Sequence, residues 1–261
     1  MKKSYTDSFF DVGSKFGFLP NNHPLTSLPN RYNSLQRLLD NMPVKLSDGS
    51  NGYLAIPNKI ENEVERLPNY IDLVKKESEI LIIQALYRAY CFLTSAYTLE
   101  LSYQEFVKTK KYGKARQILP KQVAQPFVCV AEKLDVYPWL DYHYAYSLGN
   151  YRFLDKSKGF HWSNLDQCVK FSGTSDESGF IMNHVDINQH SPKLVESVLE
   201  SLKAIKDNDQ EKLNENMKQN FHSMVFVNDR RKDMWVASRW KHYNDFRIFI
   251  MGIKGNNEIF D

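Results

Sequence analysis

The chain has 261 residues, of which 42% are hydrophobic, 25% are charged and 13% are aromatic. These values are typical of an ordinary globular protein, and the length suits one large domain or two modest ones. The formal net charge of +3 at pH 7 is too small to indicate a nucleic-acid-binding or membrane-binding surface.

The cysteines and the amino-terminal segment indicate the compartment. Cys91, Cys129 and Cys168 are odd in number and far apart, without a CxxC spacing. They favour a reducing compartment and no structural zinc. Two lysines near the amino terminus are not followed by an apolar h-region, and no run approaches the length of a membrane span. We therefore expect a cytoplasmic protein with no nucleic-acid or membrane partner.

An irregular stretch precedes the first strong helical pattern. Four prolines interrupt residues 16–46 and leave room for one short helix at about Arg31–Leu39. A loop follows at Ser47–Gly52. From near Pro68 to Glu100 or beyond, apolar residues recur at helical spacing, which predicts one long helix. Its apolar face is broad, so we expect this helix to be mostly buried.

Two connections surround the next helical piece. Lys108–Arg116 is basic, which is typical of a patch for phosphate or an acidic partner, or of a solvated loop between helices. A helix is expected near Phe127–Leu134.

The polar connection Gly159–Gly173 is the expected boundary between two lobes, which we place at residues 1–165 and 166–261.

The aromatic segment Tyr137–Tyr151 is expected to be helical from about Pro138. In an α-helix, His143, Tyr146 and Ser147 would share one face, because they are spaced i, i+3 and i+4. This face could line a pocket, and an aromatic core helix would give the same pattern.

The segment Phe171–His190 begins with small turn-forming residues and an acidic pair. The apolar stretch Gly179–Val185 follows, with His184 inside it. A histidine in such a position can offer one ring nitrogen to a dry pocket, or it can be a satisfied core residue.

Two amphipathic helices are expected next, and they favour a helical bundle. Ser191 and Pro192 have the residue types of an N-cap and a first helical position. The first apolar stripe consists of Leu194, Val195, Val198, Leu199, Leu202 and Ile205. The second consists of Leu213, Met217, Phe221 and Met224.

Arg247 lies in an apolar row of the last expected helix, at about Asp233–Gly252. The row is formed at spacings of four and three residues by Val236, Trp240, Tyr243, Arg247 and Ile250. A buried guanidinium requires a partner, because an unpaired buried charge is costly. The partner is either a ligand carboxylate or a protein carboxylate, from Asp176, Glu177 or Asp186.

Four motifs resemble the indoleamine 2,3-dioxygenase family. They are FGFLP, LPKQVAQPF, FSGTSDESGF and FRIFIMGIKGN, in the order seen in that family, and the resemblance covers about Phe16 to Asp261. It implies a mainly α-helical fold with a smaller N-terminal lobe and a helical C-terminal lobe that sandwiches haem b. It also implies oxidoreductase activity that inserts both atoms of O2 across the indole C2–C3 bond of L-tryptophan, giving N-formylkynurenine in the kynurenine pathway.

The resemblance also implies roles for individual residues. His184 would be the catalytic distal residue that accepts the indole N–H, with Phe180 packed against the indole ring. Arg247 would bind the carboxylate of the amino acid. The remaining pocket residues would be His143, Tyr146, Ser147, Tyr243 and Ile181.

Three positions depart from the better-known pattern of the family. Animal members carry a small hydroxyl residue at the position of His184, whereas a distal histidine resembles tryptophan 2,3-dioxygenases and many bacterial relatives. At the positions of His143 and His242 the family more often has Tyr or Phe. These departures leave open a haem oxygenase that acts on another indole in a biosynthetic pathway.

The histidine that ligates haem iron in the family lies downstream of the GIKGN motif. None of the seven histidines of this chain matches it, so the metal ligand is not assigned and we expect the chain to be a fragment. The remaining alternative is a non-catalytic or truncated member that binds haem or an indole.

Overall fold

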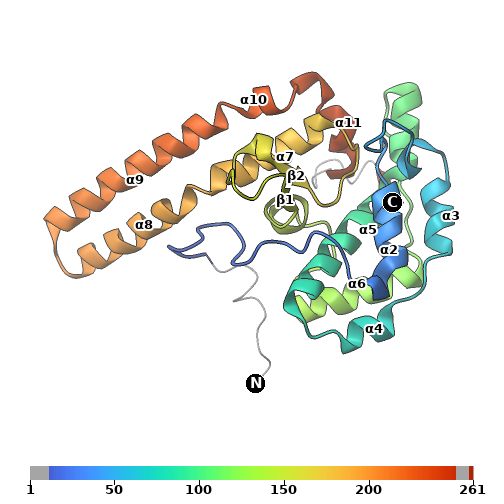
Figure 1. Ribbon diagram of the computed structural model, residues 1–261, viewed down its shortest axis with the longest axis horizontal. Coiled ribbons are helices and arrows are strands. Elements are labelled where there is room, and N and C mark those ends of the chain that lie inside the picture. The colour runs from blue at the N-terminus through green and yellow to red at the C-terminus, as the bar shows by residue number, and fades with distance from the viewer. Residues whose placement is uncertain (1–11, 251–258, 261) are drawn as a thin grey trace.

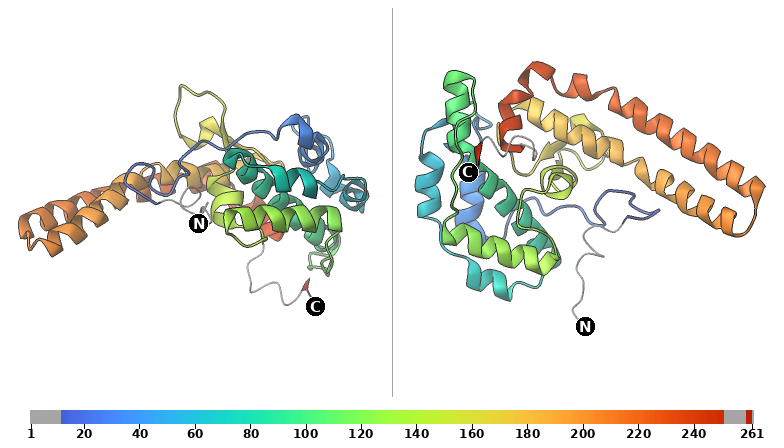
Figure 2. Two further views of the ribbon diagram at one scale, coloured as in Figure 1. Left: turned by 90° about the horizontal axis from the view of Figure 1, so that it is seen from below. Right: turned by 180° about the vertical axis from the view of Figure 1, so that it is seen from behind.

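A computed structural model describes residues 12–250 and 259–260, and these residues are mainly helical (Figure 1). The mainly α class implied by the resemblance is therefore confirmed. Short helices surround one long helix at one end of the molecule, and a helical hairpin projects from the other end (Figure 2). The candidate site lies where these two parts meet.

The long helix α5, Ile80–Thr109, is the centre of the first part. It packs against α2 (Asn33–Asn41), α3 (Lys59–Glu65) and α6 (Lys121–Leu134), while α4 (Ile71–Lys76) packs on α6. The predicted helices near Arg31–Leu39 and Phe127–Leu134 are confirmed by α2 and α6. Apolar residues on all sides of α5 are buried by these neighbours, which explains its broad apolar face.

The prediction of one helix from Pro68 to Glu100 is wrong at one point, because α4 and α5 are separate helices. Glu77 has an extended backbone, and its carboxylate accepts hydrogen bonds from the backbone N–H groups of Ser78 and Glu79. The same carboxylate pairs with Arg31 of the preceding 3₁₀ turn η1 (Asn30–Tyr32). A side chain that binds the backbone in this way competes with helix continuation.

Helix α5 also corrects the expectation that no run approaches the length of a membrane span. By length and apolar composition it is long enough to cross one. However, 83% of its most apolar window is buried within the protein, as in the core helix of a globular fold.

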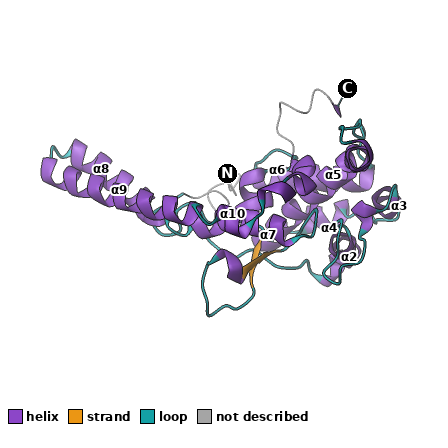
Figure 3. Cartoon of the chain, turned by 90° about the horizontal axis from the view of Figure 1, so that it is seen from above, coloured by secondary structure: helices purple, strands orange, loops and turns teal. Residues whose placement is uncertain are grey.

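The segment between α6 and α7 forms the frame of the candidate site. It contains the π-helix η3 (Tyr142–Leu148), strand β1 (Tyr151–Phe153), the 3₁₀ turn η4 (Trp162–Asn164) and strand β2 (Leu165–Gln167). The strands pair antiparallel, with Tyr151 opposite Gln167 (Figure 3). Helix α7 (Ser175–Asn188) packs on η3, η4 and β2.

Helices α8 (Ser191–Lys206) and α9 (Gln210–Arg231) form the projecting antiparallel hairpin (Figure 3). Both predicted helices are confirmed, but Ser191 does not act as an N-cap acceptor. Its hydroxyl donates to the carbonyl of Asn188 and accepts from the N–H of Phe18.

The bundle expected from the two apolar stripes does not form within the described residues. The buried hairpin contacts are small side chains, Ser197, Ser201, Ala204 and Ser223. The apolar residues that remain exposed are Val198, Leu199, Leu202 and Ile205 of α8 and Met217, Phe221 and Met224 of α9. The stripes therefore face outward, because small residues bring the two helices together along a different face.

The predicted helix at Asp233–Gly252 is also wrong. The described part of this segment is divided into α10 (Met234–Ala237), η5 (Trp240–His242), α11 (Asn244–Arg247) and η6 (Ile248–Ile250). Residues 251–258, which include much of the FRIFIMGIKGN motif, lie outside the described residues. The break after Ala237 follows from a competing interaction, because the N–H of Arg239 donates to Asp176 of α7.

Candidate functional site

The turn at Phe171–Thr174 sets the start of α7. Thr174 is the N-cap, and its hydroxyl accepts from the N–H of Glu177. Gly173 has a φ of +73°, and a Cβ there would lie 1.9 Å from the carbonyl oxygen of Lys45. Only glycine fits this close approach of two backbone segments without strain.

Glu177 holds the turn together from inside. Its carboxylate is fully buried and accepts from the N–H groups of Phe171 (2.9 Å), Ser172 (2.6 Å) and Gly173 (3.2 Å). It also accepts from the hydroxyl of Ser172 at 2.7 Å. Burial raises the pKa of this carboxyl, although these donors favour its charged form.

His184 lies three turns into α7 and is partly buried. Its Nδ1 is 2.8 Å from the carbonyl oxygen of Phe180. A carbonyl oxygen only accepts, so Nδ1 carries the proton and Nε2 is an acceptor. Burial lowers the pKa of the ring, which keeps the imidazole neutral at pH 7.

Aromatic rings surround this imidazole. The ring of Phe180 is 5.0 Å from that of His184, and the ring of Tyr142 is 5.9 Å away, both edge-on. Phe180 in turn contacts Tyr243 (5.2 Å) and Phe246 (5.7 Å). We call this group the aromatic wall: Tyr142, Phe180, His184, Tyr243 and Phe246. Its nitrogen base is the neutral imidazole of His184.

The sequence missed Tyr142 and Phe246 as members of this wall. The reason for Tyr142 is that η3 is a π-helix, in which the N–H of Tyr146 donates to the carbonyl of Asp141 five residues earlier. A wider turn changes which residues share a face. The expected face is therefore wrong for His143, which is exposed while Tyr146 and Ser147 are buried.

Three other predicted pocket residues, Tyr146, Ser147 and Ile181, are fully buried. Tyr146 is fully buried, with its hydroxyl 3.5 Å from Glu177, and its ring is 5.5 Å from that of Tyr142. Ser147 is buried, and its hydroxyl has no hydrogen-bond partner among the described residues. Ile181 is fully buried in the core.

All three protein carboxylates proposed as partners of Arg247 have other partners. Asp176 binds Arg239 with both oxygens, at 3.0 and 2.6 Å. Asp186, fully buried, binds Arg230 in the same bidentate manner, at 2.9 and 2.7 Å. Glu177 binds the turn described above.

Arg247 itself is exposed, which corrects the expectation that its guanidinium is buried in an apolar row. Val236 and Trp240 of that row are also exposed. Within residues 12–250 and 259–260, nothing accepts a hydrogen bond from the guanidinium of Arg247. Arg247 ends α11, which also supplies Phe246 to the aromatic wall. Because this guanidinium is exposed, water can solvate it, and the requirement for a charged partner that applies to a buried arginine does not hold.

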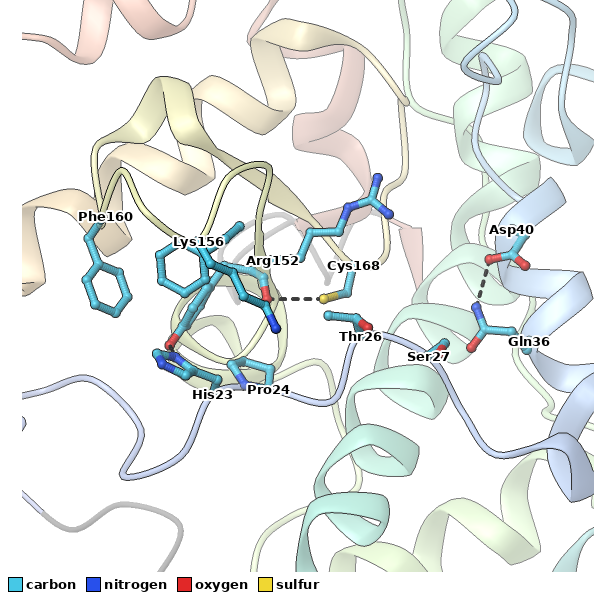
Figure 4. Close-up of a pocket in the computed structure, with 13 residues that line it drawn as sticks. His23, Pro24, Thr26, Ser27, Gln36, Asp40, Arg152, Lys156, Phe160 and Cys168 are labelled. Carbon is cyan, nitrogen blue, oxygen red and sulfur yellow. Dashed lines mark hydrogen bonds between the residues drawn. The ribbon is translucent and has the colours of Figure 1, made fainter.

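The rings of this wall meet edge-on, and the proton on Nδ1 of His184 leaves its Nε2 as an acceptor for a flat aromatic ligand or a cofactor. In the part of the chain that the structure describes, His, Cys, Asp and Glu do not cluster as a metal site. Two cavities lie away from the aromatic wall. One, of about 850 Å³, is beside β1 (Figure 4), and the other, of about 770 Å³, is between the start of α8 and α9.

The amino-acid sequence is similar to those of one family of known proteins. The model of the family described as indoleamine 2,3-dioxygenase matches residues 6–260. Indoleamine 2,3-dioxygenase 1 of Rattus norvegicus is 24% identical over 255 residues, covering 96% of this chain and 56% of the relative. Indoleamine 2,3-dioxygenase 2 of Mus musculus is 24% identical, covering 95% and 56%. An indoleamine 2,3-dioxygenase of Aspergillus nanangensis is 23% identical, covering 77% and 45%. The chain thus spans about half the length of these relatives.

Proposed function

The chain belongs to the indoleamine 2,3-dioxygenase family, and we propose that it supplies the substrate-facing wall of a haem-dependent dioxygenase that acts on an indole. The proposed substrates are L-tryptophan and O2, and the product is N-formylkynurenine. The observation that carries the proposal is the orientation of His184, a neutral imidazole with an acceptor nitrogen set in an aromatic wall.

The chemistry of an indole matches this wall. Its N–H is a donor, and His184 Nε2 is an acceptor because Nδ1 is already bonded to the carbonyl of Phe180. Its ring face is apolar and suits the edges of Phe180 and Tyr142. The amino acid carboxylate would pair with Arg247 in the bidentate manner favoured by guanidinium groups.

Haem b is the cofactor of this proposal. When bound, it would supply the iron that activates O2. His184, Phe180 and Tyr142 would contact the indole ring of the substrate. Within this wall His184 orients the indole by a hydrogen bond, without removing its proton.

The test of the proposed function is an absorption spectrum from 350 to 700 nm. The purified chain with added haemin would be reduced and measured before and after L-tryptophan. We expect the Soret band of haemin to change when the chain is added and to shift again when tryptophan is added. If the spectrum of haemin with the chain equals that of haemin alone, the chain by itself is not a dioxygenase, which supports the alternative of an inactive family member.

Replacing His184 with phenylalanine is expected to raise the Kd for tryptophan about five- to tenfold. The lost interaction is one hydrogen bond, which contributes about 1 kcal/mol net. In the unaltered protein the affinity should be constant from pH 7 to 8 and should fall only as the pH drops through the lowered pKa of His184, below its ordinary value of 6.5. The measurement is titration of the Soret shift at several pH values.

The matched control is His222→Phe, because His222 is exposed on α9, outside the aromatic wall. Its Kd and pH profile should equal those of the unaltered protein. A His184→Phe protein that retained both the affinity and the pH dependence would rule out the assigned role.

Replacing Arg247 with alanine is expected to raise the KM for tryptophan about tenfold or more, with a smaller change in kcat. Hydrogen bonds to charged groups contribute about 1.5–3 kcal/mol, and this variant removes the guanidinium that would hold the carboxylate. Indole, which lacks a carboxylate, should bind equally well to both proteins. Lys241→Ala, an exposed cation in the same segment, serves as the control. An unchanged KM in Arg247→Ala would remove this assignment.

A further inference from the structure

A cavity of about 850 Å³ lies beside β1, and the residues that line it are drawn in Figure 4. Its walls come from the segment His23–Ser27, from α2, from β1 and from the connection at residues 156–160. Its volume is within the usual range for small-molecule sites. None of the lining residues belongs to the candidate site for an indole.

Aromatic rings form one end of this cavity. Phe153 and Phe160 lie 5.0 Å apart, and His23 lies 5.3 Å from Phe153 and 6.0 Å from Phe160. Tyr151 completes the group, with its hydroxyl 2.9 Å from His23 Nδ1. This end offers ring edges and faces to a flat ligand.

The charges lining the cavity are unevenly placed. Lys156 lies beside the aromatic end, Arg152 lies between the two ends, and Asp40 and Gln36 lie at the opposite end (Figure 4). Arg152 is paired with Asp166 at 2.8 Å, and Asp40 accepts from Gln36 at 2.7 Å. The ammonium group of Lys156 has no such partner within the described residues. The positive charge next to the rings is therefore available to a ligand.

A buried guanidinium holds the two walls in place. Arg88 of α5 is 3% exposed and donates to the carbonyl of Leu25 at 2.5 Å and to that of Gly149 at 2.7 Å. Leu25 lies between lining residues on one wall, and Gly149 precedes β1 on the other. The walls are thus fixed before any ligand binds, which reduces the entropy cost of binding.

We propose that this cavity binds a small aromatic carboxylate, with its ring against Phe153, Phe160 and His23 and its carboxylate at Lys156. The arrangement of one apolar end beside one cation, with the acidic side chain far from it, matches a one-ring or two-ring acid. This site is separate from the proposed indole site and does not depend on the proposed function.

Three probes that share a phenol ring and differ in charge test the proposal. They are 4-hydroxyphenylacetate (anion), 4-methylphenol (neutral) and tyramine (cation), each titrated into the full chain by isothermal calorimetry without haem. We expect the anion to bind about tenfold or more tightly than the neutral probe, and the cation to bind most weakly. Equal binding of all three, or tightest binding of tyramine, would overturn the proposal.

Two variants locate the binding. Lys156→Met should weaken binding of the anion about tenfold and leave the neutral probe unchanged. Lys158→Met is the matched control, because Lys158 is on the same connection but pairs with Asp155 and does not line the cavity. Thr26→Trp, at an exposed lining position, should fill the cavity and abolish binding of all three probes. Retained binding of the anion in Thr26→Trp, or an equal loss in both lysine variants, would exclude this cavity as the site.

Discussion

Replacing Glu177 with alanine is expected to lower the free energy of unfolding by about 3–5 kcal/mol. The carboxylate is fully buried and accepts from three backbone N–H groups and one hydroxyl in the turn before α7. Each buried donor left without an acceptor costs about 1–3 kcal/mol. Denaturant unfolding followed by circular dichroism would measure the change.

Two controls separate the lost acceptor from the lost volume. Glu177→Gln keeps the size and one acceptor oxygen but adds an NH2 group facing the same donors, so an intermediate loss is expected. Glu200→Ala removes a partly exposed carboxylate of α8 that pairs with Lys212 at 3.5 Å, and should change the free energy of unfolding by less than about 1 kcal/mol. A Glu177→Ala protein as stable as Glu200→Ala would show that the buried network does not hold the turn.

Replacing Gly179 with alanine is expected to lower the free energy of unfolding by about 3 kcal/mol and to weaken tryptophan binding as well. A Cβ at this position would lie 1.8 Å from the carbonyl oxygen of Ala237, where α7 and α10 cross. Backbone must move to accept it, and such overpacking costs about 1–3 kcal/mol, occasionally more. The chain after Ala237 carries Tyr243 and Phe246, which contact Phe180 of α7. Its displacement should therefore move these two rings away from Phe180.

The measurements are denaturant unfolding and titration of the Soret shift with tryptophan. Gly13→Ala is the matched control, because a Cβ at Gly13 has no neighbour within 4 Å and its stability and binding should not change. An unchanged Kd in a destabilised Gly179→Ala protein would show that the close crossing supports the fold without positioning the site.

The sequence by itself determined the helical class and several of the helices. Periodic apolar residues report which segments can bury one face, and this information is local. It was sufficient for α2, α6, α8 and α9. The turn before α7 was likewise recognisable from its small residues, and His184 of α7 from its position in the apolar stretch that follows.

Only the tertiary structure decided where helices end and which carboxylate meets which guanidinium. Glu77 interrupts the helix predicted from Pro68, and Asp176 interrupts the helix predicted from Asp233, in each case by binding a backbone N–H together with an arginine. Arg247 was expected to be buried in one long helix, but that helix is interrupted after Ala237 and Arg247 is exposed. Hydrogen bonds between residues far apart in the chain compete with helix formation, and periodicity contains no information about such partners. The same limit applies to the outward-facing stripes of α8 and α9, because the packing of small side chains selected a face that apolarity did not predict.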